Sequence, residues 1–100
     1  METDQRREVR IVMRIPVTIK GVNQDGEPFV EETTTLNVSS SGACIGTRYR
    51  IPSGSILKIS SLRLNFKSSA EVRLIWQDKD EDFLRIGVEF IDSNKNWILR

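Results

Sequence analysis

Histidine is absent from this sequence of 100 residues, and cysteine occurs once, as Cys44. Without histidine, the chain lacks the commonest general base and the commonest metal ligand of proteins. One cysteine cannot form an internal disulfide, and with no histidine beside it a structural zinc site is close to excluded. We therefore expect Cys44 to be a small core residue, which suits a reducing cytosol.

Long apolar runs are missing as well. No stretch approaches the roughly eighteen consecutive apolar residues of a transmembrane helix, and the polar N-terminus has no apolar segment typical of a signal peptide. The formal net charge is only +1, so no overall basic field favours duplex nucleic acid or an anionic membrane. We expect a cytoplasmic protein without direct membrane insertion, in which any anion-binding site is local.

Motifs of common enzyme classes are also lacking. The sequence contains no nucleophile elbow, no Walker-type phosphate loop and no cluster of metal ligands. The acidic run at residues 78–82 lacks the spaced ligands and the glycine of a calcium loop, and we expect it to be a solvated turn. We therefore predict a protein that is not an enzyme and that needs no metal and no cofactor.

What the sequence does have is a series of short segments in which apolar and polar residues alternate. One hundred residues with 38% hydrophobic and 29% charged residues suit one small domain with one modest core. The alternation predicts strands at 14–20, 29–38, 43–47, within 55–64, 71–76 and 84–90. Residues typical of turns separate these segments at 23–26, 39–42, 51–54 and 65–69.

A short helix is expected at the C-terminus, where Asp92 and Ser93 are suited to cap it and Trp97 would pack against the core. About six short strands with one late helix predict an all-β protein, an antiparallel β-barrel. Trp76 is also expected to be a core or helix-packing residue.

Two groups of polar residues have side chains suited to a ligand. The first is a set of arginines before the first strand: Arg6, Arg7, Arg10 and Arg14. A guanidinium group can bind a phosphate or the edge of guanine with two parallel hydrogen bonds, and it can stack on a purine. Alone, such a charge run is more often a solvated segment.

The second group is a bend between two strands that contains Asn37, Ser39 and Gly42. An amide and a hydroxyl at alternate positions point to one side of the chain. We expect Gly42 to adopt a backbone conformation closed to other residues and to let a ligand approach closely. Such a bend alone is more often a plain turn, but the two groups together suit a guanine base that carries a phosphate.

In order and spacing these motifs resemble the PilZ domain family. The matching residues are Arg10-x-x-x-Arg14 directly before the first strand, followed by Asn37-x-Ser39-x-x-Gly42. The segments 71–76 and 86–90 are similar to the last two strands of the family, so the resemblance covers nearly the whole chain. It implies a six-stranded barrel, residues 14–100, that binds cyclic di-GMP beneath a flexible arginine arm, residues 1–13.

The resemblance also implies roles for single residues. Arg10 and Arg14 would hold guanine edges and phosphates, whereas Asn37 and Ser39 would bond a guanine from the barrel surface. Gly42 would shape the bend. Arg6 and Arg7 would make accessory phosphate contacts, and Trp76, at a strand end, would stack on a base.

Two features of the motif leave alternatives open. Arg6 and Arg10 also fit the arginine spacing, but we prefer Arg10 and Arg14 because Arg14 abuts the first strand, as in the family. Val9 stands where members that bind an intercalated ligand dimer tend to have a basic residue. This favours one ligand per domain, although Arg7 leaves two ligands possible.

The predicted function is that of a receptor whose arm becomes ordered on ligand binding and alters a contact with an unknown output protein or fused domain. The alternative is an adaptor of the same fold that works by protein contact without nucleotide, although adaptors of this kind usually lack the arginine motif. A barrel for single-stranded nucleic acid would need several exposed aromatic residues on one face, and we expect neither DNA nor RNA as a partner.

Overall fold

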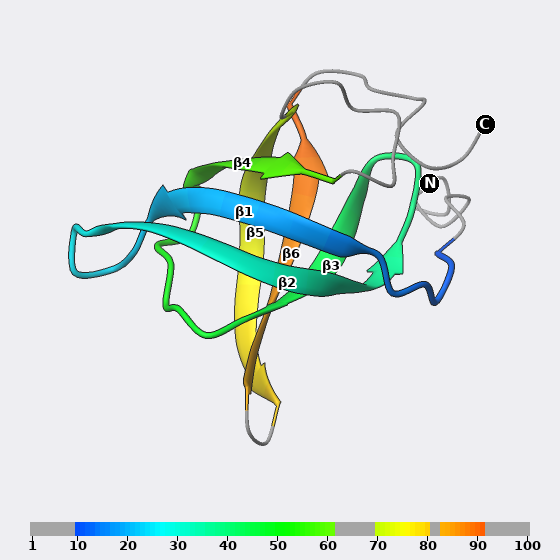
Figure 1. Cartoon of the computed structure of the whole chain (residues 1–100), viewed down its shortest axis with the longest axis horizontal. Coiled ribbons are helices and arrows are strands. Elements are labelled where there is room, and N and C mark those ends of the chain that lie inside the picture. Colours follow the sequence, from blue (N-terminus) through cyan, green and yellow to red (C-terminus); the bar gives the residue numbers. More distant parts are fainter. Residues whose placement is uncertain (1–9, 62–69, 81–82, 92–100) are drawn as a thin grey trace, which may run out of the picture.

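The computed structural model of the chain describes residues 10–61, 70–80 and 83–91, and these form a closed barrel of antiparallel strands (Figure 1). The six strands are β1 (Pro16–Val22), β2 (Pro28–Val38), β3 (Gly42–Thr47), β4 (Ile56–Ser60), β5 (Ala70–Asp80) and β6 (Phe83–Phe90). Their order around the barrel is β1-β2-β3-β6-β5-β4, and β4 closes the ring against β1. The predicted all-β antiparallel barrel is confirmed.

The C-terminal helix predicted around Asp92, Ser93 and Trp97 lies outside the described residues, as does the turn predicted at 65–69. Within the described ranges the chain contains no helix of the length and apolar character that crossing a membrane would require.

Two glycine turns fix the connections that the sequence predicted. Gly26 has a φ of 82° and ends a turn in which the Asn23 side-chain oxygen accepts hydrogen bonds from the N–H groups of Asp25 and Glu27 at 2.9 and 3.0 Å. Gly54 has a φ of 85° in the turn before β4. An L-residue with a side chain rarely adopts such a φ, which is why both turns use glycine.

The prediction of a solvated turn across residues 78–82 was wrong for residues 78–80. β5 continues through these residues, and Asp78 lies opposite Arg85 while Lys79 lies opposite Leu84. An opposite charge directly across an antiparallel pair stabilises the pairing, so the hairpin continues past the point where the acidic pattern suggests a break. Residues 81–82 lie outside the described part.

The barrel interior is filled by the apolar residues of the alternating pattern. Every strand contributes side chains to one contiguous core, and the most completely buried include Ile19, Val38, Ile45, Leu57, Val72 and Ile86. Because successive strand residues point to opposite faces, the residues between these core positions form the outer surface on which a ligand can be bound.

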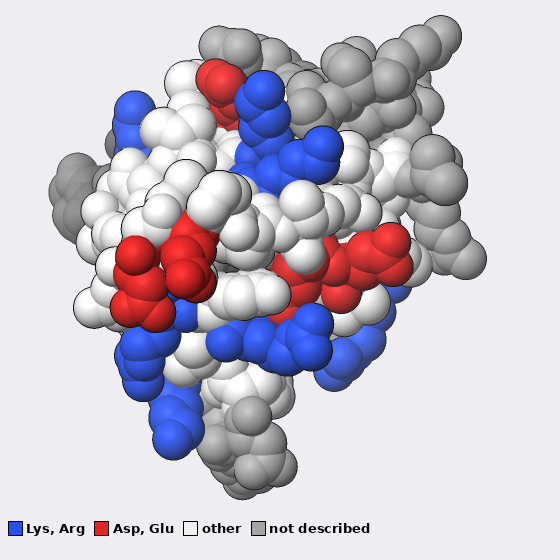
Figure 2. Space-filling model, turned by 60° about the vertical axis from the view of Figure 1, so that its left-hand side comes forward, with Lys and Arg blue, Asp and Glu red and all other residues white. Residues whose placement is uncertain are grey.

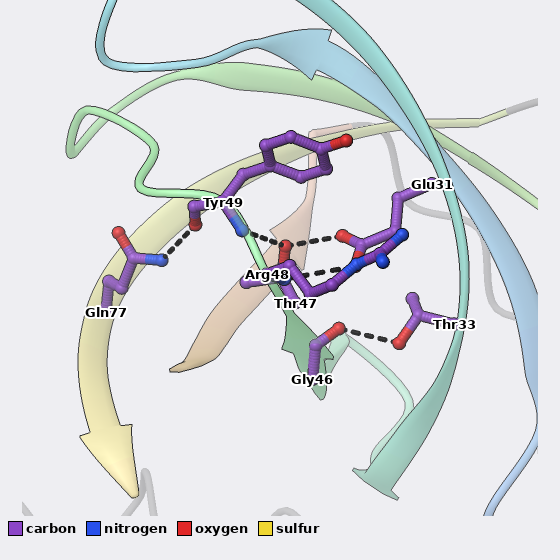
Figure 3. Close-up of polar contacts among 7 residues, drawn as sticks. All are labelled: Glu31, Thr33, Gly46, Thr47, Arg48, Tyr49 and Gln77. Atoms are coloured by element: carbon purple, nitrogen blue, oxygen red, sulfur yellow. Dashed lines mark hydrogen bonds and ion pairs between the residues drawn. The ribbon is translucent and has the colours of Figure 1, made fainter. Parts of the chain in front are cut away.

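A polar cluster around the buried Glu31 ties the segment after β3 to β2 (Figure 3). Glu31 is only 4% exposed, and its carboxylate accepts hydrogen bonds from the Thr47 hydroxyl at 2.5 Å and the Arg48 backbone N–H at 3.0 Å. On the β5 side, the Gln77 amide donates to the Tyr49 carbonyl at 2.8 Å and accepts from the Ile51 N–H at 3.0 Å. These hydrogen bonds pair the buried Glu31 carboxylate and the backbone groups of the segment that follows β3.

Replacing Glu31 with glutamine is expected to lower the free energy of unfolding by about 1.5 kcal/mol. The Thr47 hydroxyl and the Arg48 N–H each donate to a different carboxylate oxygen, whereas a glutamine side chain has only one acceptor oxygen. Urea denaturation followed by circular dichroism measures this. Glu32→Gln is the matched control, since Glu32 is exposed on the outer face of the same strand and should change stability by no more than about 0.5 kcal/mol. Equal effects of the two variants would contradict the role given to Glu31.

Candidate functional site

A β-bulge in β2 turns Asn37 toward the outside of the barrel. The strand register shifts between Thr35, which lies opposite Ile45, and Asn37, which lies opposite Cys44. Directly opposite residues point to the same face of an antiparallel pair, and Ile45 belongs to the core. Thr35 therefore points inward, whereas Asn37 and Cys44 share the outer surface, because the extra residue reverses the alternation.

The arginine segment is joined to the end of β2 next to this bulge. Ile11 and Val38 exchange two backbone hydrogen bonds, of 2.8 and 2.9 Å. This bridge brings the Arg10 Nη1 atom to within 2.8 Å of the Asn37 Oδ1 atom, to which it donates an exposed hydrogen bond. Two residues that are 27 positions apart in the sequence thus meet on the outer surface.

Of the other predicted arginines, only Arg14 lies among the described residues, and it is not joined to this pair. Arg14 is exposed, and no hydrogen bond or ion pair within the described residues links it to Asn37 or Ser39. Arg6 and Arg7 lie outside the described residues. The structure therefore brings together Arg10 and Asn37, one residue from each predicted polar group.

Thr35 anchors the same segment a second time. Its buried hydroxyl accepts a hydrogen bond from the Ile15 N–H at 2.8 Å and donates one to the Met13 carbonyl at 2.6 Å, and its own N–H donates to the Ile15 carbonyl at 3.0 Å. The backbone between Arg10 and Arg14 is therefore attached to β2 on both sides of Val12, which fixes the places from which both arginines project.

Replacing Thr35 with valine is expected to lower the free energy of unfolding by about 1 kcal/mol, because it leaves the buried Ile15 N–H without its acceptor while preserving the side-chain shape. The Ile15 amide should also exchange faster with deuterium, as detected by NMR. Thr35→Ser keeps the hydroxyl and should restore slow exchange at Ile15. Slow exchange in Thr35→Val would show that this anchor does not depend on the hydroxyl.

Ser39 and Gly42 shape the bend between β2 and β3. Ser39 is 1% exposed, its N–H donates to the Gly42 carbonyl at 2.9 Å, and its hydroxyl lies 3.5 Å from the same oxygen. The expectation that Gly42 adopts a conformation closed to other residues was wrong, since its φ lies outside the range that favours glycine. Glycine is needed because a Cβ there would stand 2.0 Å from the carbonyl oxygen of Val88 in β6.

Beside Asn37, the outer face of β3 and the middle of β6 carry four small residues, which we call the small-residue strip: Gly42, Cys44, Gly46 and Gly87. Cys44 lies opposite Asn37 on one side and opposite Gly87 on the other. A second bulge, in β5, places Trp76 opposite Gly87, and its indole covers that glycine, where a Cβ would meet the indole nitrogen at 2.2 Å. Trp76 is 39% exposed, so it does not lie in the core, while the predicted helix against which it would pack lies outside the described residues.

Positive charge flanks the strip on two sides. Burial raises the pKa of the Cys44 thiol, and the nearby guanidinium groups of Arg85 and Arg10 offset part of that rise. Cys44 is buried, as predicted, but by register it lies on the outer side of β3. On the barrel face shown in Figure 2, basic side chains stand in separate groups with acidic ones between them, in keeping with the net charge of +1.

Arg85 also lies on this surface, and the sequence motifs do not mark it. Its Nε and Nη2 atoms lie 3.0 Å from the two carboxylate oxygens of Asp78 in β5. The alternation in β6 indicated only that Arg85 points outward. The available signal was the position of Arg85 two residues before Gly87. The bulge in β5 that sets Trp76 opposite Gly87, and Asp78 opposite Arg85, cannot be recognised in the sequence.

The chain was compared with protein families, with curated proteins and with solved structures. The sequence model of the PilZ domain matches residues 4–98. No curated protein matches the chain. Among solved structures, the Bacillus subtilis inhibitor of motility MotI/DgrA superposes with a TM-score of 0.66 at 14% sequence identity. That match covers 88% of this chain and 43% of the other, so the chain spans less than half the length of this neighbour, and the likeness shows a shared fold.

Proposed function

This chain belongs to the PilZ domain family, and from this premise we propose that it is a receptor domain for cyclic di-GMP. The family consists in general of binding and adaptor domains, and a binding role fits a chain without histidine. The observation that carries the proposal is the hydrogen bond between Arg10 and Asn37, since it joins the arginine motif to the polar bend at one place on the barrel surface.

Cyclic di-GMP presents two guanine bases and two phosphates. In our proposal, Arg10 and Arg14 bind phosphate oxygens or the O6 and N7 edge of a guanine, for which the guanidinium fork is suited. The bond between Arg10 and Asn37 is exposed and contributes little net stability, so the ligand can replace it at small cost. Asn37 then bonds a guanine, and Ser39 and Gly42 set the shape of the bend that carries it.

Trp76 supplies an apolar surface at the other side of the strip. Its indole lies over Gly87 and remains 39% exposed, and an exposed indole offers a face for a purine to stack on. We propose that one guanine stacks there. A ligand held by the arginines on the β2 side would then extend across β3 toward Trp76.

The output is proposed to be a change in a protein contact. Arg6 and Arg7 would add phosphate contacts, so that binding orders the part of the 1–13 arm that precedes the Ile11–Val38 bridge on the barrel of residues 14–100. Val12, 83% exposed, lies between Arg10 and Arg14 and would border the bound ligand. The same exposed side chain favours the second candidate function, an adaptor that binds a partner protein through this segment without nucleotide.

Isothermal titration of the purified chain with cyclic di-GMP tests the proposal and gives the stoichiometry. We expect saturable heat with one ligand per chain, whereas GMP, which has a single guanine and phosphate, should bind far more weakly. Absence of heat at tens of micromolar chain would contradict the receptor function. If a partner protein then bound the chain equally well with and without cyclic di-GMP, the adaptor function would hold instead.

A further inference from the structure

Arg85 lies across the small-residue strip from Arg10. In the register it stands opposite Gly46, two residues along β6 from Gly87, which itself stands opposite Cys44. Only β3 separates β6 from β2, so these two strands are about 10 Å apart, twice the usual strand spacing. Arg85 lies two residues along β6 from Gly87, the position level with Asn37. Because Asn37, Cys44 and Gly46 share the outer face, Arg85 projects from the same surface as the proposed ligand site.

Asp78 fixes the orientation of the Arg85 guanidinium. The two 3.0 Å contacts join two nitrogens of Arg85 to two oxygens of Asp78, the bidentate geometry that sets the plane of the group as well as its position. The pair is partly exposed, with side-chain exposures of 36% and 48%. Such an exposed pair contributes at most about 1 kcal/mol to stability, and it leaves part of the Arg85 guanidinium accessible to a ligand.

We propose that Arg85 is a ligand-contacting residue on the β6 side of the cyclic di-GMP site, and that Asp78 is a positioning residue that orients it. This inference rests on the proposed function. A dinucleotide with two phosphates and two guanines, bound across β3, needs donors on both sides of that strand. Arg10 and Asn37 supply them on the β2 side, and Arg85 supplies them on the other. Both guanidinium groups act to lower the pKa of the Cys44 thiol, which agrees with both lying near it.

Titration calorimetry with cyclic di-GMP on the whole chain and a set of variants tests this inference. Arg85→Ala should raise Kd about tenfold, because a charge-assisted contact is lost. Arg85→Lys keeps the charge but not the fork, and it should raise Kd by a smaller factor. Arg50→Ala is the matched control: Arg50 is an exposed arginine in the segment between β3 and β4, and its loss should leave Kd unchanged.

Asp78→Asn separates a positioning role from a merely structural one. In the otherwise unchanged chain it should raise Kd a few-fold, whereas in the Arg85→Ala background it should have no further effect, because the residue it orients is gone. Thermal melting of each variant shows that the barrel is folded, and Arg85→Lys carries the test if Arg85→Ala does not fold.

Two results would overturn the inference, and they are distinguishable. If the unchanged chain binds cyclic di-GMP while Arg85→Ala and Arg85→Lys both bind within twofold of it, Arg85 does not contact the ligand although the receptor function stands. If the unchanged chain gives no heat, the receptor function itself fails, and the role of Arg85 fails with it.

Discussion

Replacing Arg10 with alanine is expected to weaken the binding of cyclic di-GMP by about 2 kcal/mol or more, roughly a 30-fold rise in Kd. The guanidinium would be bonded to a phosphate or a guanine edge in the complex, and charge-assisted bonds of this kind are the stronger ones. Its present partner, Asn37, is reached through an exposed bond, so its loss costs the unbound protein little. Titration calorimetry measures the change.

Two controls make the Arg10 result specific. Arg50→Ala removes an equal charge from an exposed position between β3 and β4 and should leave Kd unchanged. That result would exclude the lower net positive charge of the protein as the cause of the Arg10→Ala effect. Arg10→Lys should recover only part of the affinity, because lysine cannot form two parallel bonds. An unchanged Kd in Arg10→Ala would mean that the arginine segment does not contact the ligand.

Replacing Gly42 with alanine is expected to lower the free energy of unfolding by about 3 kcal/mol, as severe overpacking does. The new Cβ would stand 2.0 Å from the Val88 carbonyl oxygen. This neighbour is backbone, which cannot rotate away as a side chain can, so β3 and β6 would have to separate where they pair. Urea denaturation measures the loss.

Gly46→Ala is the matched control for Gly42→Ala. Gly46 lies on the same outer face of the same strand, and a Cβ there would have its nearest neighbour, in the Phe83 ring, at 3.7 Å, which is ordinary contact. We expect this variant to change the free energy of unfolding by less than about 1 kcal/mol. Similar losses in both variants would show that glycine is needed along the whole strand and not at the approach of β6.

The barrel could be predicted because apolar and polar residues alternate along most of the length of its strands. Residues such as Ile19 and Ile86 stand at the expected period and fill the core, and both glycine turns follow from local chemistry. The end of β5 could not be predicted in this way, since acidic residues favour a turn unless the opposite strand carries a partner. Arg85 is that partner, and pairing across a hairpin is not a local property.

The candidate site was predictable in part. The motif order indicated that Arg10 and Asn37 belong together, and they are hydrogen-bonded. The reason for Gly42 was mistaken because sequence does not distinguish a glycine needed for its φ from one needed for close approach. The exposure of Trp76 and the alignment of Arg85 depend on bulges, each of which reverses the faces beyond it, and no residue pattern marked their positions.

The most direct test of the central claim is an NMR titration of the whole chain with cyclic di-GMP, following the side-chain signals of Arg10, Asn37 and Trp76. The receptor account predicts that the Arg10 Nε–H, the Asn37 amide and the Trp76 indole N–H all shift and reach saturation along one binding curve, since a single ligand contacts all three. Saturable shifts confined to other parts of the barrel, with these three signals unmoved, would contradict it.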